Sequence, residues 1–442
     1  MKQLAKLYFS SSLLMRIFIG FLAGSAIGCA MWLLGTPEQT TSALQYIKPF
    51  GDLLVSMLKM IVVPVICFSL IVGSASLPIQ RFGKVGLKVI GWYLLCSFLA
   101  AAIGALMATA FNPGSEAALE AWESIAATSQ VQEAAELKAT QAEAKQGGIL
   151  SILLSMFENP FGALANGNFL AIITFSILFG LALRVLLESS KDEQQKNALN
   201  KLMEIISAGR DIIFKLVDWI LEYTPVGVFA LSIANFSAYG PKIAGPYVEV
   251  TVGVIAGVLV MVFIAYPLLL ALVTRRNPIP VMKIMQEAII TAFITRSSAA
   301  TLPVSIRVAE DDLKVKNELA SFSLPLGATI NMDGVCVHLP MFAILAANMF
   351  SMELGFSALV VLVITTVLAS IGAGGVPGGS LMLLFIILQA MGLDPTQISI
   401  IVALALGINP ILDMFETANN VTGDLVCTYA VASTSDLIDK SA

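Results

Sequence analysis

Basic residues are missing from a long C-terminal stretch of this 442-residue chain: no Lys or Arg occurs between Lys316 and Lys440. Four acidic residues nevertheless lie there among apolar neighbours, namely Asp333, Asp413, Glu416 and Asp424. An unpaired carboxylate in a low dielectric costs several kcal/mol, so each must meet a distant arginine, a proton or a cation from solution. The lack of local basic partners therefore points to cation binding.

Charged residues of both signs are scarce, at 12% of the chain against 57% hydrophobic residues, and the mean hydropathy is +0.86. This composition excludes a soluble globular protein and predicts a polytopic membrane protein. The mild net charge of −5 gives no indication of nucleic-acid binding, and none is expected. Apolar runs long enough to cross a bilayer occur at about 14–35, 50–77, 84–111, 168–190, 245–274 and 398–431.

Histidine and cysteine are also sparse. The single histidine, His338, could act as a base only with Ser297 or Ser298, and no GxSxG or HExxH context accompanies them. An intramembrane hydrolase, or any other enzyme, is therefore not expected. The cysteines lie in apolar segments without paired spacing and are expected to be reduced thiols; they are Cys29, Cys67, Cys96, Cys336 and Cys427.

Basic residues in the first two thirds of the chain fall in alternate loops, which indicates the cytoplasmic side. The basic residues that show this pattern are Lys2, Lys6, Arg16, Arg81, Lys84, Lys88, Lys191, Lys196, Lys201, Arg275 and Arg276. We therefore expect a cytoplasmic N-terminus, a first helix that is retained, and a location in the plasma membrane, the inner membrane of a bacterium. The opposite loops, 36–47 and 112–148, are poor in basic residues, and the second is a Glu/Ala/Gln-rich insert expected to be external and solvated.

Two segments lack the pattern of a spanning helix. Residues 280–318 place a polar cluster, TRSSAAT (295–301), between two arms that are each too short to cross, and residues 355–397 repeat this plan around SIGAGGVPGGS (370–380). Glycine and proline interrupt a helix, and free backbone groups survive at membrane depth only where they line a cavity or bind a ligand. Both segments predict re-entrant hairpins. Each is followed by a helix with a polar interruption, and such paired broken segments indicate a transporter's central site.

The last helix carries a single polar stripe. At roughly 100 degrees per residue, five polar side chains fall within about a 100-degree arc; they are Asp413, Glu416, Thr417, Asn420 and Asp424. The other faces are apolar, so the stripe has little water to face. We expect Asp413 to pair with a substrate amine, the Asn420 amide to donate to a substrate carboxylate, and Asp424 to bind a hard cation.

Four ordered segments resemble the signatures of the dicarboxylate/amino acid:cation symporters, the glutamate transporter homologue family. They are TRSSAATLPVS (295–305), PLGATINMDG (325–334), SIGAGGVPGG (370–379) and NPILDMFETANNVTGDL (409–425), and the earlier stretches 48–65 and 84–97 look similar as well. The resemblance implies an all-α polytopic membrane protein with eight transmembrane helices plus two re-entrant helical hairpins, arranged as inverted repeats. It also implies a homotrimer and an elevator-type mechanism.

The resemblance divides the chain into a scaffold and a transport domain. Scaffold helices 1–2 would occupy 1–83 and scaffold helices 4–5 would occupy 149–240, with the external acidic insert at 112–148. Helix 3 at 84–111 would belong to the transport domain. The rest of that domain, at 241–442, would hold helix 6, hairpin 1, helix 7, hairpin 2 and helix 8.

The resemblance also implies Na⁺ as the coupling ion, with three sites. The first would use the backbone of Gly327, Asn331 and Asn420 with the side chain of Asp424. The second would use Tyr93, Ser97, Asn331 and Asp333, and the third the carbonyls of Thr329, Ser370, Ile371 and Ala373. Family members often have Thr where this chain has Cys96, which removes one hydroxyl ligand from the second site.

For the substrate, the resemblance implies the two hairpin tips and the polar stripe. The residues are Arg296 (carbonyl), Ser298 (amide), Val376, Gly379, Asp413, Thr417 and Asn420. The main departure is Glu416, because acidic-substrate members carry Arg there and Thr where this chain has Val335. Members of the serine/threonine-transporting branch have Glu at the position of Glu416.

A carboxylate at Glu416 disfavours acidic substrates. At about 4 Å and an effective dielectric near 20, two carboxylates repel by about 4 kcal/mol, which is nearly three decades in affinity. Arg296 could pair with Glu416 or Asp413 and reduce this repulsion, and a cationic substrate could satisfy Glu416 directly. We therefore predict Na⁺-coupled symport of a small neutral amino acid such as serine, threonine or alanine. The alternatives are a Na⁺- or H⁺-coupled symporter of acidic amino acids or C4-dicarboxylates, and a passive ion channel.

Overall fold

The computed structural model describes residues 11–75, 79–114, 154, 156–166, 168–373, 375 and 378–439. These residues are overwhelmingly helical, and the only β pairing among them is an isolated bridge between Val315 and Ile438. Most of the 112–148 insert and the proposed substrate residue Val376 lie outside the described residues. The prediction of an all-α protein is confirmed.

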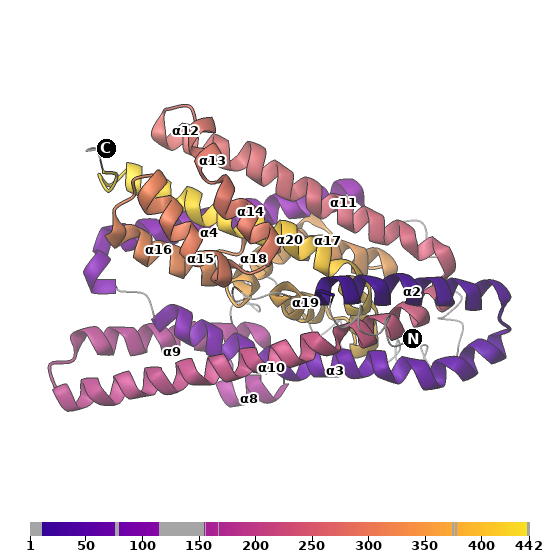
Figure 1. Ribbon diagram of the computed structural model, residues 1–442. Helices are drawn as coiled ribbons and strands as arrows, with labels where there is room; N and C mark the ends of the chain where they lie inside the picture. The colour runs from indigo at the N-terminus through magenta and orange to yellow at the C-terminus, as the bar shows by residue number, and fades with distance from the viewer. Residues whose placement is uncertain are drawn as a thin grey trace.

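Four long helices form one layer of the molecule. They are α2 (Leu13–Leu34), α3 (Pro37–Ala75), α9 (Phe169–Ser189) and α10 (Glu193–Tyr239), with the short α8 (Pro160–Asn166) beside α9. Helix α10 packs along both α2 and α3, and α9 packs on α3 (Figure 1). This layer contains the helices that the sequence predicted as a scaffold.

The remaining helices form a second, thicker layer. They are α4 (Ile79–Phe111), α11 (Ala244–Val260), α12 (Tyr266–Thr274), α13 (Ile279–Ile284), α14 (Gln286–Thr295), α15 (Ser298–Arg307), α16 (Asn317–Ile330), α17 (Asp333–Met349), α18 (Phe356–Ser370), α19 (Gly379–Ala390) and α20 (Pro395–Ser433). Helices α17 and α20 lie at the centre of this layer, because α17 packs on α4 and α20 packs on α14, α16 and α17. Figure 1 shows α14 to α20 gathered together, above α3 and α10.

Within the described residues, eight segments are long and apolar enough to cross a membrane. They are Met15–Leu34, Pro37–Ala75, Lys84–Phe111, Ala171–Ser189, Glu193–Ala238, Ala244–Thr274, Asn317–Met349 and Gln397–Ser433. Two of them, Glu193–Ala238 and Asn317–Met349, are absent from the apolar runs found in the sequence, since charged residues or a polar break interrupt them. The total of eight agrees with the predicted number.

The two predicted hairpins are pairs of short helices that contact each other, α14 with α15 and α18 with α19. Even the longest of the four, α18 with 15 residues, is only about 22 Å long at 1.5 Å per residue, short of the roughly 30 Å hydrocarbon core. The helical pairs therefore exist, whereas their re-entry into a membrane stays a prediction.

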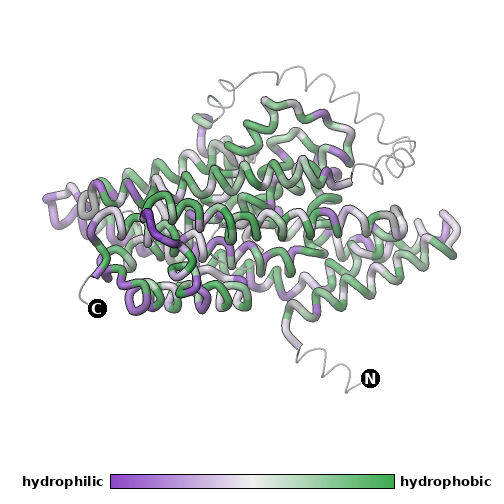
Figure 2. Tube along the Cα trace, turned by 90° about the horizontal axis from the view of Figure 1, so that it is seen from above, coloured by the Kyte–Doolittle hydropathy of each residue, from purple (hydrophilic) through white to green (hydrophobic). Residues whose placement is uncertain are grey.

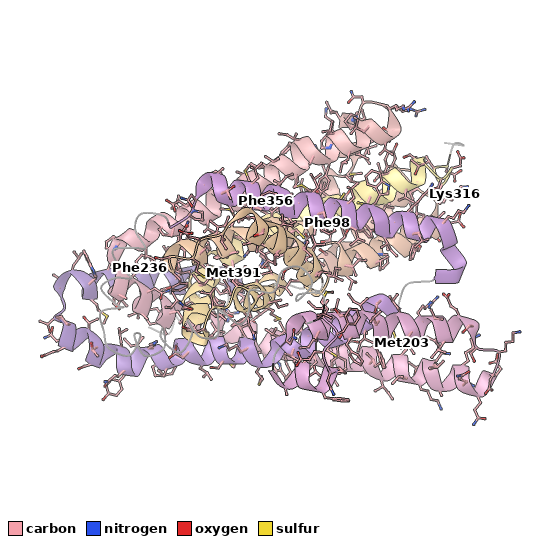
Figure 3. The ribbon with its side chains drawn as sticks, turned by 180° about the vertical axis from the view of Figure 1, so that it is seen from behind. Phe98, Met203, Phe236, Lys316, Phe356 and Met391 are labelled. Carbon is pink, nitrogen blue, oxygen red and sulfur yellow. The ribbon has the colours of Figure 1, made fainter. Side chains whose placement is uncertain are left out.

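The outer surface of both layers is apolar, as a lipid-facing protein requires. Figure 2 shows hydrophobic residues along the long helices, with many of the hydrophilic residues at the helix ends. Large apolar side chains are exposed over these surfaces, including Phe98 on α4 at 42% and Phe356 at the start of α18 at 83%. Figure 3 shows both on the outside of the molecule. The protein is an integral membrane protein.

Candidate substrate and sodium site

The centre of the second layer holds a break in one helix. Helix α16 ends at Ile330 and α17 begins at Asp333, and the two residues between them, Asn331 and Met332, have non-helical φ/ψ values of −101°/81° and −107°/62°. The sequence around the break favours it, because Asn331, Asp333 and Gly334 are poor helix formers. The interruption lets Asn331 Nδ2 and the Gly334 amide reach side-chain oxygens of α20.

Helix α20 has a well-capped N-terminus. Asp394 and Gln397 form a reciprocal capping box, in which each backbone N–H donates to the other's side-chain oxygen at 2.9 Å. Pro395 occupies the first helical position, where its missing N–H costs nothing. The helix then continues without interruption to Ser433, and its polar stripe is buried: the side chains of Asp413 and Asp424 are 5% and 3% exposed.

Asp333 is the most enclosed of the acids, with no exposed surface. The hydroxyl of Ser97 on α4 donates to Oδ1 at 2.9 Å, and the hydroxyl of Tyr266 donates to Oδ2 at 2.6 Å. Tyr266 directly follows a π-helical turn, Met261–Ala265, that joins α11 to α12, a kind of irregularity found often at functional sites. Three helices thus converge on one carboxylate.

Asp424 forms a second oxygen cluster next to the first. Asn331 Nδ2 donates to Asp424 Oδ1 at 2.9 Å, while Asn331 Oδ1 is buried without a hydrogen-bond partner among the described atoms. A Cβ on Gly327 would overlap Asp424 Oδ1 and lie 2.7 Å from the Tyr93 hydroxyl. The absence of a side chain at Gly327 therefore lets the backbone of α16 approach this carboxylate.

These contacts bring together most of the residues proposed for the first two Na⁺ sites. Asn420 contacts Gly334 and Met332 instead, and the Tyr93 hydroxyl lies beside Gly327 and donates to the Ser323 carbonyl. Gly327, Asn331 and Asp424 lie together, and so do Ser97 and Asp333, while a Cβ on Gly423 would touch both Asp333 Oδ2 and Asn331 Nδ2, at 2.6 and 3.0 Å. The residues proposed for the third site are not joined in this way. Among the described contacts, none links Thr329 to Ser370, Ile371 or Ala373, although Ala373 N donates to Ser370 O at 3.1 Å. The third site stays a prediction.

A cavity lies beside these clusters, between α20, the helix break and the two hairpin tips. Its volume is about 10 Å³, the space of roughly one water molecule. Eight of the nine proposed substrate residues line it, all except Val376: Arg296, Ser298, Val335, Gly379, Asp413, Glu416, Thr417 and Asn420. The motif residues from four separate segments therefore meet at one place.

Asp413 connects the second hairpin to α20. The amide of Gly378, at the start of α19, donates to Asp413 Oδ2 at 3.2 Å. Gly378 has φ +76°, a left-handed conformation that favours glycine. One turn along α20, the Thr417 hydroxyl donates to the Asp413 carbonyl at 2.7 Å. The Asp413 carboxylate is thus fixed in the cavity wall.

The two hairpin tips touch each other over this cavity. The hydroxyl of Ser297 and the amide of Ala299 both donate to the carbonyl of Gly375, at 2.7 and 3.2 Å. Arg296, which caps α14, has φ +54°, an uncommon conformation for a residue with a side chain. The tips must therefore separate before an amino acid can enter a space this small.

The acids of the site have no Lys or Arg partner. Among the described residues, none of Asp333, Asp413, Glu416 and Asp424 lies within 4.0 Å of a Lys or Arg nitrogen, and this includes Arg296. No ion pair of Arg296 with Glu416 or Asp413 is therefore formed, although Arg296 lies near enough to Asp413 for the two charges to interact. Instead, Nδ1 of His338 on α17 contacts Oε1 of Glu416.

Helices α17 and α20 meet along an antiparallel seam. Asn331 pairs with Asp424, Gly334 N donates to Asn420 Oδ1 at 2.7 Å, and His338 pairs with Glu416. A Cβ on Gly334 would overlap the Glu416 backbone, whose carbonyl carbon it would meet at 2.7 Å. Glycine at this position thus permits the close approach.

Comparison with known proteins agrees with this geometry. Residues 13–434 match the profile of the sodium:dicarboxylate symporter family. The chain belongs to this family. Members of the sodium:dicarboxylate symporter family are sodium-coupled, elevator-type transporters of amino acids or dicarboxylates, and the chain is a transporter rather than an enzyme.

Individual relatives of the chain include transporters with different names. It is 30% identical to a putative sodium-dependent excitatory amino acid transporter, glt-4 of Caenorhabditis elegans, over 97% of this chain and 90% of the relative. It is 28% identical to the serine/threonine transporter SstT of Bifidobacterium adolescentis, over 95% and 89%. It is 29% identical to a proton/sodium-glutamate symport protein of Geobacillus stearothermophilus, over 92% and 91%.

Sequence reasoning missed several residues of this symporter site. Tyr266 carried a signal, since a buried tyrosine usually needs a hydrogen-bond partner, yet it stands alone in an apolar run. Met332 and Ser380 line the cavity without any distinguishing pattern. His338 was considered only as a catalytic base, although it lies four residues after Gly334, on the same face of α17.

The seam gives a first testable prediction for this symporter. Gly334→Ala will force α17 and α20 apart, because the new Cβ meets rigid backbone, and overpacking of this kind costs about 1–3 kcal/mol. We expect a lower melting temperature in detergent and weaker Na⁺-dependent binding. Gly91→Ala on α4 is the control, since no atom lies within 4 Å of its Cβ position and alanine favours helix. Equal melting temperatures for the two variants would contradict the prediction.

Proposed function

We propose that this protein is a Na⁺-coupled symporter of a small neutral amino acid that carries a hydroxyl group, serine or threonine. The observation that carries this proposal is the side chain of Glu416. It lines the cavity, is 1% exposed, and its Oε2 has no hydrogen-bond partner among the described atoms. A buried carboxylate oxygen without a donor calls for one from the substrate, and a hydroxyl group supplies it.

The charge balance of the cavity supports a neutral substrate. Asp413 can pair with the α-ammonium group, while the Asn420 amide and the hairpin-tip backbone can bind the α-carboxylate. A second carboxylate on the substrate would then lie near Glu416, with no guanidinium on α20 to receive it. Acidic substrates remain the second candidate, since two of the relatives named above are excitatory amino acid or glutamate transporters.

The ligand chemistry supports a monovalent cation. Each oxygen cluster has one carboxylate, Asp333 or Asp424, surrounded by neutral hydroxyl and amide groups. Divalent ions are usually held by several carboxylates, and the described residues contain no cluster of three or more His, Cys, Asp or Glu suited to a metal ion. The buried, unpartnered Oδ1 of Asn331 is a further oxygen donor for Na⁺.

The boundary between the two layers supports movement of one against the other. A cavity of about 1050 Å³ lies between the two layers. Residues of α3 and α10, such as Val72 and Phe214, line one side, and Ala299, Thr329 and Gly375 line the other. We propose that α2, α3, α9 and α10 (within 1–83 and 149–240) form the scaffold, and that 84–111 and 241–442 form the transport domain of a homotrimer.

We propose that the protein lies in the inner membrane of a bacterium with a cytoplasmic N-terminus, which eight spans would place on the same side as the C-terminus. Lys88 Nζ donates to the Thr434 carbonyl at 3.2 Å, and Lys316 N donates to the Leu437 carbonyl at 2.9 Å. These lysines therefore lie at the same end as the C-terminus, and the positive-inside rule makes this the cytoplasmic end.

Uptake into proteoliposomes tests the function. With an inward Na⁺ gradient, labelled serine and threonine are expected to accumulate above the external concentration, and replacement of Na⁺ by choline should abolish accumulation. Entry that stops at equal concentrations would indicate a channel. Accumulation driven by a proton gradient alone, or a preference for aspartate, glutamate or succinate over serine, would overturn the proposal.

Asp424→Asn tests the coupling ion. The substitution removes the only formal negative charge from the first proposed Na⁺ site, and hydrogen bonds or contacts to a charged group are worth about 1.5–3 kcal/mol. We expect the Na⁺ concentration for half-maximal serine uptake to rise at least about tenfold. Asp218→Asn, on the exposed surface of α10, is the matched control. An unchanged Na⁺ dependence in Asp424→Asn would remove this residue from the ion site.

A further inference from the structure

His338 is the only histidine in the chain, and it is completely buried. Its Nδ1 contacts Oε1 of Glu416, and its Nε2 has no hydrogen-bond partner among the described atoms. The ring packs against Phe342 with 4.7 Å between ring centres. An ionised Glu416 only accepts hydrogen bonds, and with Glu416 in this form the contact requires the hydrogen on Nδ1.

The seam explains why this contact forms. Positions four apart share a helix face. His338 lies four residues after Gly334 on α17, and Glu416 lies four residues before Asn420 on α20. Because the two helices are antiparallel, His338 lies opposite Glu416 when Gly334 lies opposite Asn420. Glycine at 334 lets the two backbones approach, which brings the imidazole ring against the Glu416 carboxylate. His338 itself does not line the cavity, whereas Glu416 does.

Glu416 is therefore held by one oxygen and has the other free. Oε1 is occupied by His338, and Oε2 is buried without a partner in the described part of the chain. Arg296, the basic residue that lines the same cavity, makes no ion pair with Glu416. The orientation of the carboxylate then depends on the imidazole ring that contacts it.

We propose that His338 is a specificity-positioning residue that fixes the Glu416 carboxylate so that Oε2 accepts a hydrogen bond from the side-chain hydroxyl of the substrate. The inference rests on the proposed function and deepens it. His338 touches neither the substrate nor Na⁺ and acts through Glu416. A site that offers a fixed, buried acceptor discriminates against an analogue without the hydroxyl, because the acceptor is left unpaired; serine is thus preferred over alanine.

The test compares serine with alanine in the purified protein in proteoliposomes, under one Na⁺ gradient. His338→Leu replaces the imidazole by an apolar side chain of similar bulk and removes the donor. We expect the KM for serine to rise at least about tenfold, as loss of a charge-assisted hydrogen bond implies. The KM for alanine and the Vmax for both should stay nearly unchanged. His338→Asn, whose amide nitrogen can replace Nδ1, should restore the serine preference.

A double-variant cycle tests whether His338 acts through Glu416. In a Glu416→Ala background, His338→Leu should no longer change the KM ratio of serine to alanine. Thermal unfolding gives a second readout. His338→Leu should lower the melting temperature more in the unmodified protein than in a protein that already carries Glu416→Leu, because only the first case leaves a buried carboxylate without a donor.

The outcomes separate the two proposals. Equal rises in KM for serine and alanine, together with additive effects in the cycle, would make His338 a packing residue while the serine preference of the unmodified protein stands. A preference of the unmodified protein for aspartate, or for alanine over serine, would overturn both the proposed function and the hydroxyl acceptor at Glu416. Non-additive melting temperatures with equal KM shifts would retain the pair but overturn its role in specificity.

Discussion

Replacement of Asp413 by Asn will reduce amino-acid uptake by at least about a hundredfold, because removal of one partner from a buried charged pair costs about 3–5 kcal/mol. The carboxylate is fixed in the cavity wall by the Gly378 amide at 3.2 Å, and no basic side chain lies within 4.0 Å of it among the described residues. In the proposed mode of binding, the ammonium group of the substrate is the partner that the variant would leave unpaired. Initial rates of serine uptake at saturating Na⁺ measure the effect.

The matched control for this experiment is Asp218→Asn, which makes the same chemical change at an exposed carboxylate beside Lys215. Its uptake is expected to equal that of the unmodified protein. Size-exclusion chromatography of both variants shows whether assembly is intact. High-affinity uptake by Asp413→Asn would mean that the substrate ammonium binds elsewhere in the cavity.

Glu416→Arg will change the order of substrates. The change removes a repulsion of about 4 kcal/mol toward a second carboxylate and supplies a guanidinium that can bind a carboxylate with two hydrogen bonds. We expect the preference for aspartate relative to serine to rise by about three decades, measured as competition of unlabelled amino acids against labelled serine or aspartate. His338 can adapt, because the other tautomer of the ring accepts a hydrogen bond at Nδ1.

The full shift depends on a second position. Val335 lines the same cavity without a polar group, so the double variant with Val335→Thr is expected to favour aspartate more strongly than Glu416→Arg alone. Glu204→Arg, a charge reversal on the exposed surface of α10, controls for net charge. If aspartate already competes best against the unmodified protein, Glu416 does not set specificity.

The central helix of the site was predictable because its signal is local. The 3.6-residue period places Asp413, Glu416 and Asn420 on one face, and the helix that carries them is continuous and buried on that face. The hairpins were predictable for a similar reason, since glycine, proline and short polar clusters interrupt helices wherever they occur. Such features depend on neighbouring residues alone.

The partners of these residues were not predictable, because they come from distant segments. Glu416 meets His338, and Asp333 meets Tyr266, across separations of 78 and 67 residues. The sequence left open a pairing of Arg296 with Glu416 or Asp413 and did not identify His338 as a partner. His338 contacts Glu416 because Gly334 allows α17 to pack closely against α20. No pattern within either helix predicts this close packing. The Glu193–Ala238 span was overlooked because charged residues occupy part of α10, where the mean hydropathy of the best window is only 1.4.

The antiparallel seam between α17 and α20 separates two tasks along one line of contacts. One end, at Asn331 and Asp424, holds the proposed cation ligands, and the other end, at His338 and Glu416, holds the proposed acceptor for the substrate side chain, with the Gly334–Asn420 contact between them. Substitutions at the second end can therefore create a transporter for a different solute while the ion-driven machinery is inherited intact. Within one fold, this arrangement allows the substrate specificity to change while the ion coupling is kept.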